Sequence, residues 1–143
     1  MAEKLFTATV TAQGGREGHI HSEDGVLKHS IAMPGTPRMK EIPDAVTPEH
    51  LFAAGYAACF DGALNLMAKK AKVKSFQSET TAVVSFLKDQ SDDGFKLAVD
   101  LEIKGKGVEQ AELEELVEKA HHFCPYSKAT RGNIDVTLNV TAE

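Results

Sequence analysis

The sequence predicts an α+β protein in which antiparallel strands surround one long central helix. Several short segments alternate apolar and polar side chains, the pattern of half-buried strands. Between them lies a nearly unbroken apolar stretch, residues 51–68, preceded by helix-start signals. The predicted order of elements is βββαββαβ, which belongs to the α+β class. Because 143 residues suffice for a core of their own, we expect a single domain over residues 1–143.

The sequence pattern of the N-terminal part predicts a three-stranded antiparallel meander. Residues 5–12 alternate as a strand, and the glycine-rich segment 14–18 breaks it. Residues 19–22 and 26–33 are the next two strands, separated by the turn signal Glu-Asp-Gly. The proline-containing residues 34–45 are expected to form a loop that leads into the long helix.

The central helix is predicted over residues 47–73. Thr47 is a suitable N-cap, and Pro48 fits the first helical position, where its missing N–H costs nothing. The segment is apolar on nearly every side, so other parts of a protein should surround it. Asp61 in mid-run and lysines at the end argue against a membrane span. Its many small residues let another backbone approach, and a second copy of the same helix would fit there.

The C-terminal half predicts two more strands, a helix and a last strand. Residues 76–87 and 95–104 are the strands, joined by a polar turn. Residues 108–123 carry apolar side chains at helical spacing, and residues 134–140 alternate again.

Composition and charge exclude several functions. Hydrophobic residues make up 42% and charged residues 26% of the chain, so disorder is not expected. The net charge of -5 comes without a basic stripe, which argues against a nucleic-acid partner. Because no signal peptide or lipid anchor is visible, we expect a cytoplasmic location and no membrane partner. In that compartment a cysteine pair is more often catalytic or redox-sensing than structural.

The chain has two cysteines, and each lies on the apolar stripe of its own predicted helix. Cys59 is more than three turns inside the central helix, where the helix dipole gives a thiolate no help. Cys124 lies at the end of the second helix, directly before Pro125. Taken alone, either residue is most simply a small buried hydrophobe. If the two helices pack face to face, however, the two sulfurs come within disulfide reach.

Two thiols that can meet suggest a peroxidatic and a resolving cysteine. A thiolate that attacks an O–O bond becomes a sulfenic acid, which a second thiol converts into a disulfide. Cys59 would be the attacker and Cys124, at a movable helix end, the resolving thiol. A thiol with a pKa of ~8.5 needs a nearby cation to ionise at neutral pH. Three arginines beside glycine or proline are candidates, and the sequence alone does not choose among Arg16, Arg38 and Arg131.

Three segments resemble the organic hydroperoxide resistance (Ohr) proteins of the Ohr/OsmC family. They are Gly-Gly-Arg-Glu-Gly at 14–18, Thr-Pro-Glu-His-Leu-Phe-Ala-Ala-Gly-Tyr-Ala-Ala-Cys-Phe at 47–60, and Phe-Cys-Pro-Tyr-Ser-Lys-Ala-Thr-Arg-Gly-Asn-Ile-Asp-Val at 123–136. The similarity covers essentially the whole chain, and Cys-Pro-Tyr-Ser-Lys-Ala-Thr favours the Ohr branch over the OsmC branch. The resemblance implies an OsmC-like fold and a bacterial thiol peroxidase that reduces organic hydroperoxides, including lipid-derived ones. It also implies dihydrolipoamide or a lipoylated protein as the external reductant, with no bound cofactor.

The resemblance also implies roles for single residues. Cys59 matches the peroxidatic cysteine and Cys124 the resolving one. Arg16 matches the arginine that orients the thiolate, and Glu49 the carboxylate that holds this arginine by a salt bridge. The family usually has Asn-Pro-Glu-Gln where this chain has Thr-Pro-Glu-His at 47–50, and we expect the side chain of His50 to be exposed.

The spacing of Glu49 and Cys59 predicts a shared site. Ten helical residues separate them, which is a rise of about 15 Å. Glu49 cannot easily serve the Cys59 of its own chain. We therefore expect the pair of Arg16 and Glu49 at each site to come from the partner subunit of an intertwined homodimer.

An apolar hydroperoxide needs apolar walls around the thiol. Aromatic side chains near the two cysteines and apolar residues of the proline-containing loop are the expected substrate contacts. They are Phe52, Tyr56, Phe60, Phe123, Met39 and Ile42.

Three alternatives remain open at this point: an OsmC-branch peroxidase, a non-catalytic thiol redox sensor, and a metal site. A sensor reacts once whereas an enzyme turns over, so turnover separates these two. Zinc would accept His121, His122, Cys59 and Cys124 as ligands. Against a metal, adjacent helical histidines point about 100° apart, and no CxxC or HxxxH spacing is present.

Overall fold

The computed structural model of the chain describes residues 2–143 and confirms the α+β class. The elements in chain order are β1 (Val10–Gln13), the 3-10 helix η1 (Gly15–Glu17), β2 (His19–Ser22), β3 (Lys28–Ser30), α1 (Pro37–Glu41), α2 (Pro48–Lys70), β4 (Gln77–Asp89), β5 (Gly94–Lys106), α3 (Gln110–Phe123), α4 (Pro125–Thr130) and β6 (Val136–Ala142). They form two compact units, residues 1–51 and residues 52–143. The expectation of a single domain stays a prediction.

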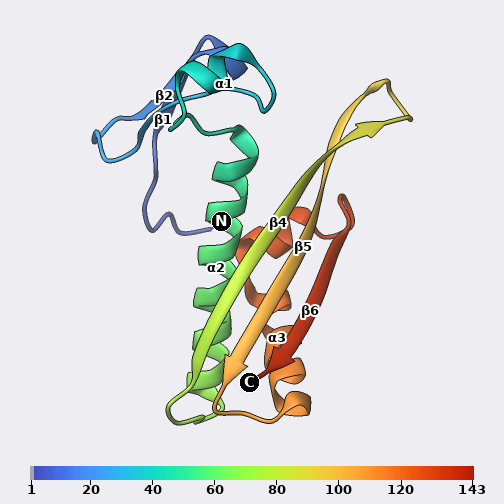
Figure 1. Ribbon diagram of the computed structural model, residues 1–143. Helices are drawn as coiled ribbons and strands as arrows, with labels where there is room; N and C mark the ends of the chain where they lie inside the picture. Colours follow the sequence, from blue (N-terminus) through green and yellow to red (C-terminus); the bar gives the residue numbers. More distant parts are fainter. Residues whose placement is uncertain (1) are drawn as a thin grey trace. The chain divides into compact units, whose positions relative to one another are not determined.

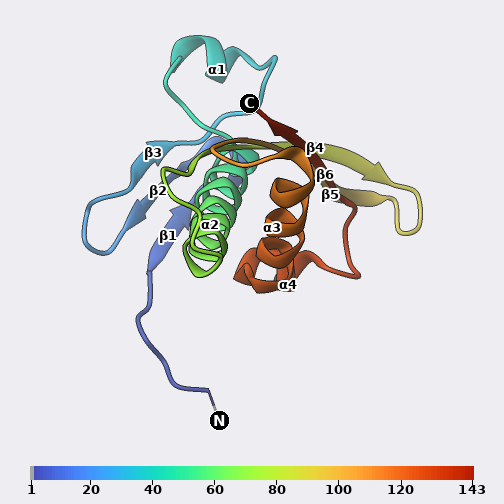
Figure 2. The same cartoon turned by 90° about the horizontal axis from the view of Figure 1, so that it is seen from below.

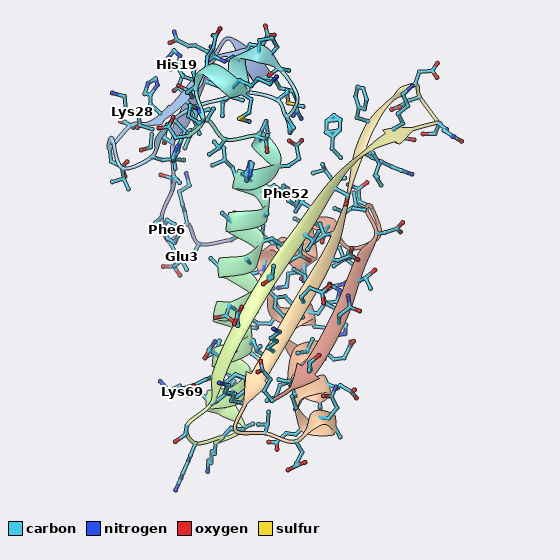
Figure 3. All side chains as sticks on the ribbon, viewed as in Figure 1. Glu3, Phe6, His19, Lys28, Phe52 and Lys69 are labelled. Carbon is cyan, nitrogen blue, oxygen red and sulfur yellow. The ribbon has the colours of Figure 1, made fainter. Side chains whose placement is uncertain are left out.

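The first unit contains the predicted antiparallel meander, in the order β1-β2-β3. Its first strand is shorter than predicted, because β1 starts at Val10 rather than at residue 5. The register explains the difference: Val10 pairs with Ser22, the last residue of β2, so residues 5–9 face no strand of this sheet. The side chains of His19 and Lys28 extend from this sheet (Figure 3).

A short helix replaces part of the predicted loop in the first unit. Helix α1 starts at Pro37, and the side chain of Thr36 accepts a hydrogen bond from the N–H of Met39. This is the Thr-Pro start signal that also opens the long helix. Sequence patterning predicts a loop here because the five residues of α1 are too few to show apolar periodicity.

Helix α2 begins where the sequence predicts. The side chain of Thr47 accepts a hydrogen bond from the N–H of His50 at 3.0 Å, and Nδ1 of His50 accepts one from the N–H of Thr47 at 3.0 Å. Two otherwise unsatisfied donors are thus satisfied reciprocally, as in a capping box. His50 is exposed, as expected, and its ring replaces the usual glutamate or glutamine of this motif.

The second unit is a three-stranded sheet, β4-β5-β6, with α2 and α3 side by side on one face (Figures 1 and 2). Strands β4 and β5 form the predicted antiparallel hairpin, whereas β6 pairs with β5 in parallel. The expectation of antiparallel strands is therefore wrong for this pair. The chain between β5 and β6 runs through α3 and α4, and a helical crossover of this length returns a strand in parallel.

The core of the second unit fills the space between the two helices and the sheet (Figure 3). Its buried apolar side chains come from α2, β5, α3 and the residue before α4. They are Tyr56, Phe60, Ala63, Leu64, Met67, Ala68, Val99, Leu101, Ile103, Leu113, Leu116, Val117, Ala120 and Cys124. The predicted apolar faces of the second helix and of the return strand are confirmed over most of their length.

The polar face of α2 is fixed to strand β4. The carboxylate of Asp61 accepts hydrogen bonds from the hydroxyls of Ser78 and Thr80 at 2.8 and 2.9 Å, and Asn65 donates to Ser78 at 2.8 Å. By length and composition alone α2 could cross a membrane, a test that core helices of soluble proteins also pass. Six of its side chains are buried in the structure: Tyr56, Phe60, Ala63, Leu64, Met67 and Ala68.

Candidate active site

The two cysteines meet in the second unit. Cys59, half-buried on α2, and Cys124, fully buried at the junction of α3 and α4, place their sulfurs 3.6 Å apart as free thiols. A disulfide bond has a length of about 2.05 Å, so a small approach would join them. The prediction that the two cysteines could come within disulfide reach is confirmed.

The pKa of the Cys59 thiol is raised in this environment. Burial is the main cause, because the thiolate is poorly solvated there; the neighbouring Cys124 raises the pKa further. The backbone N–H of Tyr126 acts in the opposite direction by hydrogen bonding to the sulfur. All of these groups are uncharged or acidic. None of them carries a positive charge that would favour the thiolate.

Gly55 lets the ring of Tyr126 pack closely against α2, the helix that carries Cys59. A side chain at position 55 would collide with the ring of Tyr126, because a Cβ there would lie 2.6 Å from the phenol oxygen. The ring packs in the space that glycine leaves, one turn before Cys59. A glycine inside a helix costs about 1 kcal/mol relative to alanine, and this close contact accounts for its presence.

Arg16 and Glu49 form a bidentate ion pair in the first unit. Nη2 of Arg16 donates to Oε1 of Glu49 at 2.7 Å, and Nη1 donates to Oε2 at 3.0 Å. Nη1 also approaches the sulfur of Met33 at 3.2 Å. The guanidinium holds the pKa of Glu49 below its usual value, chiefly through these hydrogen bonds. The salt bridge that the resemblance implies is therefore present.

The other two candidate arginines are bound to the backbone. Arg38 donates to the carbonyl oxygens of Ile31 and Gly18 at 2.8 and 2.9 Å, which ties α1 to the loop and strand before it. Arg131 donates to the carbonyl oxygen of His121 at the end of α3. Both side chains thus hold neighbouring backbone segments together.

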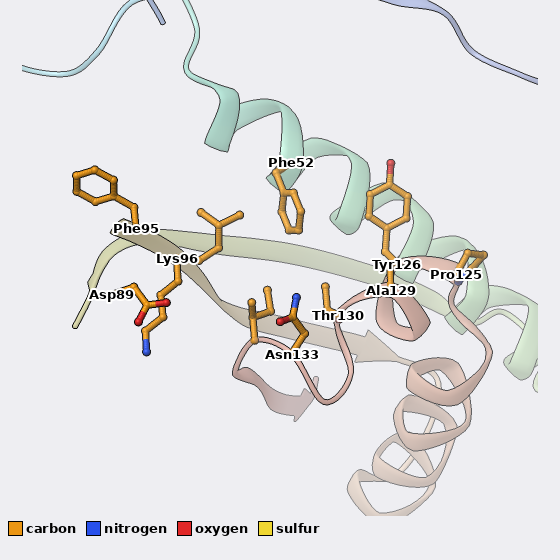
Figure 4. Close-up of a pocket in the computed structure, with 11 residues that line it drawn as sticks. Phe52, Asp89, Phe95, Lys96, Pro125, Tyr126, Ala129, Thr130 and Asn133 are labelled. Atoms are coloured by element: carbon orange, nitrogen blue, oxygen red, sulfur yellow. The ribbon is translucent and has the colours of Figure 1, made fainter. Parts of the chain in front are cut away.

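A cavity of about 690 Å³ lies against the segment that follows Cys124. Figure 4 shows it between α2, the β4–β5 hairpin and α4. Its apolar wall includes Phe52, Phe95, Leu97, Pro125, Tyr126, Ala129 and Ile134. Polar atoms come from Asp89, Lys96, Thr130 and Asn133. Pro125 and Tyr126, the two residues after Cys124, line this cavity, and the backbone N–H of Tyr126 also donates to Cys59.

The predicted substrate contacts fall into four groups. Phe52 lines the cavity. Tyr56 and Phe60 are fully buried in the core, while Phe123 is 46% exposed and lies under the ammonium group of Lys70. Met39 and Ile42 are half-buried in the first unit, on α1 and directly after it. Contact of these residues with substrate stays a prediction.

Sequence reasoning missed the residues that follow Cys124. Pro125 occupies the first position of α4, and Ser127 and Thr130 of this helix are buried. A proline directly after the helix-ending cysteine was available as a start signal for a new helix.

The residues considered for zinc are not arranged around a metal. Among residues 2–143, no group of three or more His, Cys, Asp or Glu side chains could hold a metal ion. Nδ1 of His121 instead lies 2.8 Å from the hydroxyl of Ser127.

Fold and site together define an α+β protein with two free thiols in near contact and a largely apolar cavity lined in part by the residues that follow Cys124. Comparison with known proteins agrees with this class. A family model described as OsmC-like protein matches residues 39–139. The chain is 61% identical to the organic hydroperoxide resistance protein OhrA of Bacillus subtilis, over 98% of this chain and 99% of that protein.

Solved structures give the same result. The crystal structure of OhrB of Bacillus subtilis superposes with a TM-score of 0.90 at 52% identity, covering 96% of this chain and 99% of that one. An organic hydroperoxide resistance protein from Legionella pneumophila superposes with a TM-score of 0.86 at 44% identity, covering 97% and 99% of the two chains. The chain belongs to the organic hydroperoxide resistance proteins of the OsmC-like family.

Proposed function

We propose that the protein is a thiol peroxidase that reduces organic hydroperoxides to alcohols. The observation that carries this proposal is the 3.6 Å approach of the Cys59 and Cys124 sulfurs, in a chain whose relatives are organic hydroperoxide resistance proteins. Two free thiols this close can complete a peroxidase cycle without rearrangement of the core.

The chemistry runs in two oxidative steps. The Cys59 thiolate attacks the terminal oxygen of the hydroperoxide, the O–O bond breaks, and the alkoxide leaves and takes up a proton as the alcohol. Cys59 is then a sulfenic acid. The sulfur of Cys124 attacks the sulfur of Cys59, water leaves, and the disulfide forms.

A dithiol then restores the reduced protein by two thiol–disulfide exchanges. Following the family resemblance, dihydrolipoamide or a lipoylated protein is the reductant, and the protein acts in the cytoplasm without a bound cofactor. Cys124 is fully buried and Cys59 is half-buried. This difference favours attack of the reductant on the sulfur of Cys59, which leaves Cys124 as the departing thiol.

The cavity supports a preference for bulky substrates. A volume of about 690 Å³ is within the range of small-molecule pockets, and aromatic and aliphatic side chains form most of its wall. Aryl and alkyl hydroperoxides would bury apolar surface there, whereas hydrogen peroxide would not. We therefore expect a higher kcat/KM for the organic substrates than for hydrogen peroxide.

The ion pair of Arg16 and Glu49 would supply the missing cation from a partner subunit. Glu49 lies ten residues before Cys59 on the same helix, a rise of about 15 Å. In an intertwined homodimer the guanidinium held by Glu49 of one chain would face Cys59 of the other. Its positive charge would then lower the pKa that burial raises.

Steady-state kinetics tests the proposed function. Reduction of cumene hydroperoxide is followed with dihydrolipoamide as reductant, in the wild type and in Cys59→Ser. Turnover by the wild type alone supports the peroxidase. A folded wild-type protein with two free thiols and no turnover with any dithiol would support the redox-sensor alternative instead.

A further inference from the structure

A buried hydrogen-bond network joins α4 to α2 and α3, the two helices that carry or precede the cysteines. The hydroxyl of Tyr56 on α2 lies 2.8 Å from the hydroxyl of Ser127 and 3.2 Å from that of Thr130, both on α4. Nδ1 of His121 on α3 lies 2.8 Å from the hydroxyl of Ser127. The hydroxyl of Thr130 donates to the carbonyl oxygen of Ser127 at 3.2 Å.

Counting protons fixes the direction of every bond in this network. Thr130 uses its single hydroxyl proton on the carbonyl of Ser127, so Tyr56 must donate to Thr130. Ser127 must then donate to Tyr56, because the proton of Tyr56 is already used. The contact between Ser127 and His121 can form only if Nδ1 of His121 carries a proton and donates it. All four bonds therefore require a proton on Nδ1 of His121, which in a neutral ring is one of the two tautomers.

The environment of His121 agrees with a neutral ring. Its pKa is lowered, first by burial and then by the positive charge of Arg131. At neutral pH the ring thus holds one proton, and the network places it on Nδ1.

The network is well placed to control Cys124. Cys124 joins α3 to α4 in an extended conformation, so the position of its sulfur depends on how α4 is held. Ser127 lies three residues after it and is fully buried, as is Tyr56. Tyr56 is one turn before Cys59 on α2. The network thereby connects α2, which carries Cys59, to the start of α4, which Cys124 directly precedes.

We propose that Tyr56, Ser127 and His121 are positioning residues that hold Cys124 beside Cys59. They thereby set the effective concentration of the Cys124 thiol around the sulfur of Cys59. The role of this proximity in resolution rests on the proposed function. The proximity itself can be measured without any peroxide.

Equilibration with glutathione measures this effective concentration. One molecule of glutathione disulfide oxidises the two protein thiols to the Cys59–Cys124 disulfide and becomes two molecules of glutathione. We expect the effective concentration to fall about tenfold in Ser127→Ala and in Tyr56→Phe, because each leaves a buried polar group without its partner. Circular dichroism verifies that each variant is folded. If Ser127→Ala does not fold, the effective concentration in Tyr56→Phe tests the proposal.

Two further variants separate positioning from general stability. The amide nitrogen of asparagine can replace Nδ1 of histidine, whereas that of glutamine replaces Nε2. His121→Asn should therefore keep the effective concentration near that of the wild type, and His121→Gln should lower it. Thr80→Ala is the control, because it removes a hydrogen bond of similar length that joins β4 to α2 and does not involve α4. It should leave the effective concentration unchanged.

An unchanged or increased effective concentration in folded Tyr56→Phe would overturn the proposal, as would an equal loss in Thr80→Ala. Absence of peroxide turnover in the wild type would contradict the proposed function and would leave this result intact, since glutathione disulfide is the oxidant here.

Discussion

At the scale of single residues, the central feature is a thiol whose surroundings in the second unit oppose its ionisation. Burial and Cys124 raise the pKa of Cys59, and the N–H of Tyr126 lowers it only in part. The cysteines themselves could be predicted from the sequence, because the chain has only two and each continues an apolar stripe. Tyr126 could not, because it acts through its backbone, which no side-chain pattern reveals.

The contribution of Arg16 can be measured through the pKa of Cys59. If the guanidinium of a partner subunit faces the thiol, Arg16→Ala should raise this pKa by about 1–3 pH units. The rate of alkylation against pH gives the value, in a Cys124→Ser background that removes the second thiol. Lys40→Ala, which removes an exposed charge on α1, is the control and should leave the pKa as it is. Equal pKa values in the Arg16→Ala variant and its parent would refute this role.

The ion pair of Arg16 and Glu49 should make a small, pH-dependent contribution to stability. Because the Arg16 side chain is 40% exposed, solvent screens the pair, and we expect a coupling free energy below about 1 kcal/mol. Folding lowers the pKa of Glu49 from 4.5, so this contribution is present at neutral pH and is lost as the pH falls through the lowered value. A double-mutant cycle with Glu49→Gln and Arg16→Gln, measured by urea unfolding at several pH values, tests this. A coupling that grows on acidification would have the wrong sign.

At the scale of elements, the long helix and the β4–β5 hairpin could be predicted, whereas the short helices and one strand direction could not. Helix α2 has both a start signal and a long apolar run, and the hairpin has alternation on both sides of a polar turn. Helix α1 has a Thr-Pro start signal and α4 a proline at its first position, but both helices have too few residues for periodicity. The parallel pairing of β6 depends on how the α3–α4 crossover packs, which strand patterning does not encode.

The start of α2 offers a direct test at this scale. Thr47 and His50 satisfy each other's backbone N–H groups, so Thr47→Ala should reduce the free energy of unfolding by about 1 kcal/mol. Urea unfolding measures the difference. Thr7→Ala, at an exposed position outside any helix or strand, is the matched control and should change little. A Thr47→Ala variant as stable as this control would show that the cap contributes nothing.

At the scale of the whole molecule, the account requires two chains for each working site. The first unit holds the cation and its carboxylate, and the second unit holds both thiols and the cavity. The spacing of Glu49 and Cys59 along α2 predicts that the pair of Arg16 and Glu49 serves the Cys59 of another chain. The partner's contribution is a proposal, and mixing two inactive variants can test it.

The test combines Cys59→Ser with Arg16→Ala. If Arg16 serves the other chain, a heterodimer pairs an intact Arg16 with an intact Cys59, and mixtures refolded together should regain peroxidase turnover. If Arg16 serves its own chain, no site in the heterodimer is complete and the mixture stays inactive. Light scattering verifies that the mixture is dimeric, and a stable monomer with full activity would contradict the shared site.

A single-turnover mass measurement tests most directly whether Cys59 attacks the hydroperoxide and Cys124 resolves the product. Reduced protein is mixed with one equivalent of cumene hydroperoxide, and intact and peptide masses are recorded. The account predicts that the wild type loses two hydrogen atoms as the disulfide forms, while Cys124→Ser gains one oxygen atom on Cys59. Oxygen appearing on Cys124 in Cys59→Ser at the same rate, or a wild-type mass that does not change, would contradict it.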